Sequence, residues 1–235
     1  MQKRFKYERI VLDYRLILER RKTISATVFP NQALVVKAPQ HAAADRIDAF
    51  LRRKARWILK QQRYFARFKP KSEKEYVSGE TFRYIGRGYK LLVRKTNGPE
   101  RVSLQHGVLT VYSTAPKNRV HQEKLLNLWY KERAREYFPD RLQACASKYG
   151  LNIVPGLIIR PMTRRWGSFS RKTNRICLNS ELIKASRRQI DYVLTHELCH
   201  ISHPSHNKAF QKLLSERFPD WERVKSELEI KLLAA

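Results

Sequence analysis

Apolar residues alternate with polar ones over residues 10–40, and this spacing predicts β structure. Ile24, Ala26 and Val28 stand two apart, and a turn-forming segment at 30–32 follows them before the next apolar run. Two alternating segments around such a turn are typical of a β-hairpin. We therefore expect the chain to begin with short strands.

The spacing becomes helical from residue 43 to residue 68. The apolar positions that share one face are Ile47, Phe50, Leu51, Trp57 and Ile58. The opposite face carries Arg52, Arg53, Lys54, Arg56 and Lys60. A period near 3.6 with one apolar and one charged face predicts an amphipathic helix.

A second β-rich stretch covers 76–112, where glycine-containing turns separate short apolar runs. The segment 114–120, which contains Pro116, separates this stretch from a mostly helical remainder. We therefore expect an α+β protein with two domains. A β-rich N-terminal domain over 1–115 would include the long helix, and a mostly helical C-terminal domain would cover 120–235.

The C-terminal domain is predicted to contain helices around one short β-hairpin. Helical spacing from residue 121 breaks near Pro139, and two strands at 157–160 and 175–178 are joined by a basic loop. The next helix begins after Ser186, which can act as its N-cap. The last helix covers 208–233 and is interrupted at Pro219. The hairpin thus precedes the helix that Ser186 begins.

Composition predicts a soluble cytoplasmic protein. Apolar residues make up 42% of the 235 residues, which is enough for a core. The three cysteines include no CxxC pair and do not form a disulfide framework. The first ten residues lack the apolar core of a signal peptide, and no run approaches the roughly 18–20 apolar residues of a membrane span. No pattern indicates the oligomeric state.

The formal net charge of +28 is extreme, and the basic residues are concentrated in two stretches. Residues 51–70 and 141–180 each contain eight lysines and arginines and no acidic residue. Such fields attract partners that carry phosphates, including nucleic acid. The simpler interpretation is a solvated surface, with the aromatic residues of the first stretch in the core.

The chemistry of the chain is concentrated at His196-Glu197-Leu198-Cys199-His200. Positions i and i+4 lie on one face of a helix, so both imidazoles can bind one zinc ion. The glutamate after the first histidine then lies beside the water that the metal activates, where it can act as a general base. Cys199 lies off this face and is expected to pack as a small apolar residue.

A catalytic zinc site needs a third protein ligand. We expect His206, because Pro204 ends the helix and lets the chain turn back towards the metal. His203 would lie about 10.5 Å from His196 along a continued helix, too far for one metal. Glu216 is the remaining alternative. The alternative to a metal site is a surface helix with two incidental histidines. On a half-buried helix face, histidines without a metal would need other partners for their ring nitrogens.

The chain resembles the YgjP-like metallopeptidase family, whose metal site is similar to that of the SprT and WLM zinc peptidases. The motifs that carry the resemblance are Arg165-Trp166-Gly167-Ser168, Ile176-Cys177-Leu178-Asn179, Ile190-Asp191-Tyr192-Val193, the HExxH stretch, and Ser205-His206 through Phe210. It extends to upstream segments such as Gly79-Glu80-Thr81-Phe82. The resemblance implies a zincin-like C-terminal domain, zinc ligands at His196, His200 and His206, and a catalytic carboxylate at Glu197. Phe169 departs from the family, which commonly has cysteine there.

The loop before Gly167 is a candidate substrate-binding element. Arg164 and Arg165 are expected to bind an anionic group or to stabilise developing oxyanion charge. Trp166 is more simply interpreted as a core residue.

Three functions are compatible with these patterns. The first is a zinc-dependent peptidase acting on peptides or proteins, and the second is a metal-dependent phosphohydrolase acting on nucleotides. In the third, the protein binds nucleic acid through its basic helix and its metal site acts on bound partners.

Overall fold

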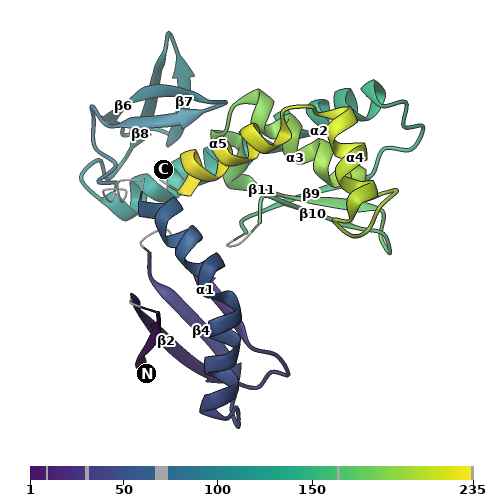
Figure 1. Ribbon diagram of the computed structural model, residues 1–235. Helices are drawn as coiled ribbons and strands as arrows, with labels where there is room; N and C mark the ends of the chain where they lie inside the picture. The colour runs from purple at the N-terminus through teal and green to yellow at the C-terminus, as the bar shows by residue number, and fades with distance from the viewer. Residues whose placement is uncertain (9, 30–31, 67–73, 163–164, 234–235) are drawn as a thin grey trace. The chain divides into compact units, whose positions relative to one another are not determined.

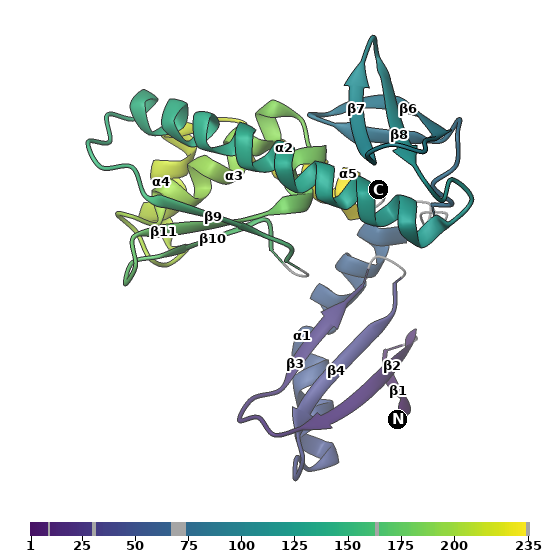
Figure 2. The same cartoon turned by 180° about the vertical axis from the view of Figure 1, so that it is seen from behind.

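The structure, a computed structural model of the 235-residue chain, describes residues 1–8, 10–29, 32–66, 74–162 and 165–233 (Figures 1 and 2). It confirms the α+β prediction, since runs of mainly antiparallel strands are followed by helices along the chain. The chain divides into two compact units. Unit 1 comprises Met1–Ser72 with Leu233–Ala235, and unit 2 comprises Glu73–Leu232.

Unit 1 is a four-stranded sheet covered by one helix. Its strands are β1 (Gln2–Tyr7), β2 (Ile10–Glu19), β3 (Ser25–Val28) and β4 (Leu34–Pro39), in the order β1-β2-β4-β3. The predicted hairpin is the antiparallel pair β3 and β4, although its turn residues 30–31 lie outside the described residues. The helix α1 (Ala44–Ala66) buries Ile47, Leu51 and Ile58 in a core with β2 and β4, which confirms most of its predicted apolar face. The prediction is wrong for Trp57, which is 43% exposed. The predicted end of this helix, 67–68, also lies outside the described residues.

A second four-stranded sheet opens unit 2 and repeats the plan of the first. The strands β5 (Thr81–Tyr84), β6 (Arg87–Lys95), β7 (Arg101–Gln105) and β8 (Val108–Ser113) are arranged in the order β5-β6-β8-β7. In each sheet the central pair is parallel and the two outer pairs are antiparallel. In each case a long helix follows the fourth strand. The structure thus contains a repeat of strand order that the sequence does not reveal.

The second sheet shares its core with the C-terminal helices. Leu91 and Leu109 belong to the same buried cluster as Leu126 and Trp129 of α2 (Arg119–Lys148). For this reason the compact units divide at residues 72 and 73, whereas the predicted domain boundary lies in the segment 114–120. Figure 2 shows α2 running from the sheet β5–β8 to the strands β9–β11.

The predicted break at Pro139 is wrong, because α2 continues through it. A proline inside a helix removes one hydrogen bond and costs about 3 kcal/mol. Phe138 and Leu142, on either side of the proline, are buried in the unit 2 core. Their packing outweighs the local cost, and local sequence signals do not report such packing.

A three-stranded sheet precedes the HExxH helix, and it corrects the predicted strand pairing. The strands β9 (Gly156–Arg160) and β11 (Arg175–Asn179) exist as predicted, but they run parallel. The hairpin is formed by β10 (Gly167–Ser170) and β11, so β10 lies at the edge of the order β10-β11-β9. The predicted basic loop therefore contains a strand, which its polar sequence conceals.

The remaining elements are helical. The short helix η1 (Ser180–Lys184) leads to α3 (Arg187–Cys199), where Ser186 forms the predicted N-cap together with Gln189. The interruption at Pro219 is also confirmed, since α4 (Lys208–Arg217) and α5 (Trp221–Leu233) are separate helices. In the part of the chain that the structure describes, no helix combines the length and apolar character that crossing a membrane requires.

Candidate metal centre

Three histidines from the end of α3 and the following loop lie close together. His196 is in the last turn of α3, His200 is its C-cap residue, and His206 lies just before α4. Their potential ligand atoms all lie within 4.8 Å of one another. The Nε2 atoms of His196 and His206 are 2.9 Å apart. This geometry suits a metal ion, because three imidazole nitrogens converge on one point.

The environment of His196 and His206 favours their neutral, metal-binding form. Burial, together with the charges of His200 and His206, lowers the pKa of His196 to about 3. Burial also lowers the pKa of His206. The Nδ1 atom of His200 lies 3.0 Å from the backbone carbonyl of His203, so its N–H can donate there and leave Nε2 free for a metal. The donor set therefore fits zinc or a similar transition metal.

The ring of Phe210 packs against all three imidazoles. The ring centroid of Phe210 lies 5.0 Å from that of His196 and 4.7 Å from those of His200 and His206. Phe210 is 1% exposed, and the side chain of Asn207 accepts a hydrogen bond from its backbone N–H as the N-cap of α4. The start of α4 thereby fixes the loop that carries His206.

Glu197 lies on the buried side of α3, next to strand β10. Burial raises the pKa of Glu197 to about 7, although a hydrogen bond from the Phe169 backbone N–H and the charge of Arg165 act in the opposite direction. A Cβ atom at Gly167 would lie only 2.7 Å from Oε1 of Glu197. The glycine therefore lets the strand approach the carboxyl group. At neutral pH this group is poised to exchange a proton.

The other predicted site residues are distributed differently. Arg164 lies outside the described residues, and Arg165 is exposed while acting electrostatically on Glu197. Neither His203 nor Glu216 belongs to the cluster of potential ligands in the described chain. Cys199 is fully buried, as predicted. Trp166 packs against the unit 2 core, in agreement with its simpler interpretation.

Two residues support the site in ways that the sequence analysis did not assign. Arg171 donates hydrogen bonds to the carbonyls of Ile201 and Ser202, at 2.7 and 3.3 Å, and so holds the loop after α3. Asn179 is buried and donates to the carbonyl of Arg165 at 3.1 Å, which anchors the loop before β10. These roles depend on contacts across the fold, and spacing along the chain does not report them.

Part of the basic stretch 141–180 is used within the fold. Arg141 forms two hydrogen bonds with the Asp191 carboxylate, at 2.9 and 2.8 Å. Such a bidentate pair joins α2 to α3 and neutralises the arginine. The stretch is therefore a weaker anion-attracting field than its composition suggests.

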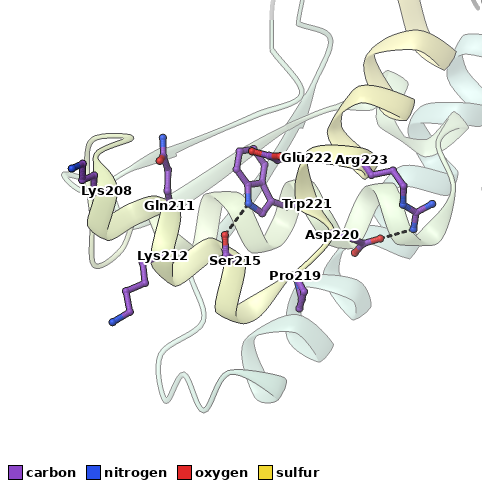
Figure 3. Close-up of a pocket in the computed structure, with 9 residues that line it drawn as sticks. All are labelled: Lys208, Gln211, Lys212, Ser215, Pro219, Asp220, Trp221, Glu222 and Arg223. Atoms are coloured by element: carbon purple, nitrogen blue, oxygen red, sulfur yellow. Dashed lines mark hydrogen bonds and ion pairs between the residues drawn. The ribbon is translucent and has the colours of Figure 1, made fainter.

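A separate hollow lies between α4 and α5 (Figure 3). Trp221 donates to the Ser215 hydroxyl at 3.0 Å within it, and Asp220 pairs with Arg223 at 2.6 Å. None of the three clustered histidines lines this hollow. We therefore place the candidate chemistry at the histidine cluster.

Clustered imidazoles beside a buried glutamate on the same helix are typical of metal-dependent hydrolases. The family profile described as YgjP-like, metallopeptidase domain, matches residues 22–231. The chain therefore belongs to the YgjP-like metallopeptidase family, which confirms the resemblance stated above.

Two solved structures show partial similarity to this chain. The metallopeptidase zymogen abylysin of Pyrococcus abyssi is 22% identical, with a TM-score of 0.38 over 40% of this chain and 94% of that chain. The metallopeptidase zymogen jannalysin of Methanocaldococcus jannaschii is 27% identical, with a TM-score of 0.35 over 40% of this chain and 87% of that chain. No curated protein matches the chain.

Proposed function

We propose that this chain is a zinc-dependent peptidase in which His196, His200 and His206 hold the metal. The observation that carries the proposal is the convergence of three imidazoles within 4.8 Å next to a buried carboxyl group. Three histidine ligands leave one coordination position open, which is characteristic of catalytic zinc. When bound there, zinc polarises a carbonyl group and lowers the pKa of water.

Glu197 is the general base in this proposal. Its raised pKa of about 7 lets it accept a proton from the attacking water and return that proton to the leaving amine. The Phe169 N–H orients the carboxylate, and Gly167 leaves room for it. Arg165, and Arg164 beside it in the sequence, are proposed to stabilise negative charge at the cleaved carbonyl.

We further propose that an extended peptide binds along β10. This strand lies at the edge of its sheet, and it contacts α3, which carries Glu197. An edge strand offers unpaired backbone groups to an added strand. A peptide paired with β10 would run past the carboxyl group of Glu197.

Hydrolysis assays with the zinc-loaded protein test this proposal and its alternative. We expect cleavage of a mixed peptide library and no hydrolysis of nucleoside triphosphates. Glu197→Gln is expected to lower peptide turnover by about 100-fold or more, because general-base catalysis contributes about 10²–10⁴. Glu216→Gln, a matched change at an exposed glutamate, is expected to have no effect.

Metal analysis separates the ligand assignment from the reaction. About one zinc per chain is expected for the wild type, with a clear loss in His206→Ala and retention in His203→Ala. Nucleotide hydrolysis that depends on Glu197 would favour the phosphohydrolase alternative. Equal turnover by wild type and Glu197→Gln on peptides would exclude Glu197 as the base.

A further inference from the structure

The outer side of α1 carries a continuous stripe of cations. We define the basic face of α1 as Arg52, Arg53, Arg56, Lys60 and Arg63, all of which are exposed. At 100° per residue these five positions lie within about 100° of the helix circumference and span about 16 Å. There is no acidic residue between Ala49 and Ala66 to interrupt the stripe. The basic face is therefore one surface of a single sign.

The cations of the basic face are not neutralised within the described part of the chain. Among the residues described, none of the five forms an ion pair. In the same unit, by contrast, Arg4 pairs with Asp13, and Lys37 pairs with Glu19. Like charges four residues apart also destabilise a helix. The stripe is thus an unfavourable arrangement for the isolated protein, and an external polyanion would relieve it.

The contacts of the basic face leave its guanidinium groups available. The guanidinium of Arg52 lies 5.6 Å from the ring centroid of Phe5, and that of Arg53 lies 5.9 Å from that of Phe50. Nε of Arg63 donates to the Leu59 carbonyl at 3.4 Å, which leaves its two terminal nitrogens unused by that bond. Four of the five residues are arginines, whose planar fork matches phosphate oxygens.

We propose that the basic face of α1 binds the phosphate backbone of nucleic acid, with little preference for base sequence. Residues 1–72 contain nineteen lysines and arginines against five acidic residues, so the whole unit supports this charge. Trp57 lies beside the stripe and is 43% exposed, which gives one aromatic ring to contact a sugar or base. The site is separate from the proposed peptidase activity and does not depend on it.

The packing of α1 favours nucleic acid over an anionic membrane. A helix that lies in a membrane surface inserts its apolar face among the lipids. In α1 that face is already used, since Leu51, Ala55 and Ile58 are fully buried in the core of unit 1. Only the charged face is available, and it suits a phosphate backbone outside any bilayer.

Fluorescence anisotropy with a labelled 20-base-pair DNA duplex tests the proposal on the full chain. The test variant is Arg52→Gln/Arg56→Gln/Arg63→Gln, because glutamine keeps a high helix propensity. The matched control is Lys3→Gln/Lys6→Gln/Arg15→Gln, which removes the same charge from exposed positions on β1 and β2 of the same unit. Circular dichroism and thermal melting confirm that both variants are folded.

We expect the wild type to bind the duplex and to lose affinity steeply as salt rises. Each lost phosphate contact lowers the slope of log K against log salt by about 0.9, so the α1 variant should lose about 2 to 3 in slope. The same relation predicts about a 100-fold loss of affinity near 0.15 M salt. The control variant should stay within about threefold of the wild type.

Three results would overturn the proposal. The first is the absence of wild-type binding at 0.05 M salt, and the second is an equal loss of affinity in both triple variants. The third is binding to phosphatidylserine vesicles without binding to DNA. Loss of peptidase activity in the Glu197→Gln variant does not affect any of these measurements.

Discussion

Replacing Gly167 with alanine should lower turnover much more than stability. The added Cβ would lie 2.7 Å from Oε1, 2.9 Å from Cγ and 3.1 Å from Cδ of Glu197. The first two distances are shorter than real Cβ contacts, so one of the two groups must move. The Glu197 side chain moves more easily than the backbone of β10, which is paired with β11. The carboxyl group should therefore shift by several tenths of an ångström or more.

Two magnitudes decide the expected outcome. Overpacking in a core typically costs about 1–3 kcal/mol, and we expect the lower end because a side chain can adjust. A misplacement of about 1 Å can reduce the rate of a positioned reaction by about 10²-fold. Gly167→Ala should thus lose 10- to 100-fold in kcat/KM, while its free energy of unfolding falls by about 1 kcal/mol.

The assay combines peptide hydrolysis, zinc content and urea unfolding of the same preparations. Gly156→Ala is the matched control, because its new Cβ would meet Cγ of the Arg175 side chain at 3.2 Å, away from Glu197. Zinc content should be unchanged in both variants. Full turnover in Gly167→Ala would refute the reasoning, since it would mean that the position of the Glu197 carboxyl group does not limit the reaction.

Three further predictions concern the supports of the site and of unit 2. Arg171→Gln removes the donor to the carbonyls of Ile201 and Ser202, so zinc affinity should fall about tenfold in a chelator competition. Phe210→Ala should lower the free energy of unfolding by about 3–5 kcal/mol in urea, with loss of zinc, because it removes a buried ring below the histidines. Hydrogen bonds to Glu100 lower its pKa from 4.5 to about 2, so its contribution to stability is complete above pH 4.5 and is lost as the pH falls towards 2. Unfolding midpoints between pH 6 and pH 2 should therefore fall less steeply in Glu100→Gln than in the wild type.

The sequence predicts those features that depend on local chemistry. Ser186 forms the predicted N-cap of α3, because serine is a preferred N-cap residue, and the structure adds Gln189, which completes a capping box. The histidine spacing within α3 likewise follows from the helical period. Pro204 correctly predicts that the chain turns after α3 and brings His206 back to His196.

Features that depend on contacts across the fold could not be predicted. The helix α2 continues through Pro139 because Phe138 and Leu142 beside it are buried in the core. The strand β10 is only four residues long and lacks an alternating pattern, and its pairing with β11 defines it. The position of Phe210 under the imidazoles depends on where α4 meets α3, which no local pattern specifies.

The repeated strand order gives the chain two scaffolds that can diverge at different rates. In the second copy, the helix α2 contributes to the core beneath the histidine-bearing α3, so its surface is constrained by the site. In the first copy, the exposed side of α1 meets solvent and can accept substitutions without disturbing a core. Substitutions on the exposed side of α1 can therefore change the proposed nucleic-acid site without changing the core that supports the candidate metal centre.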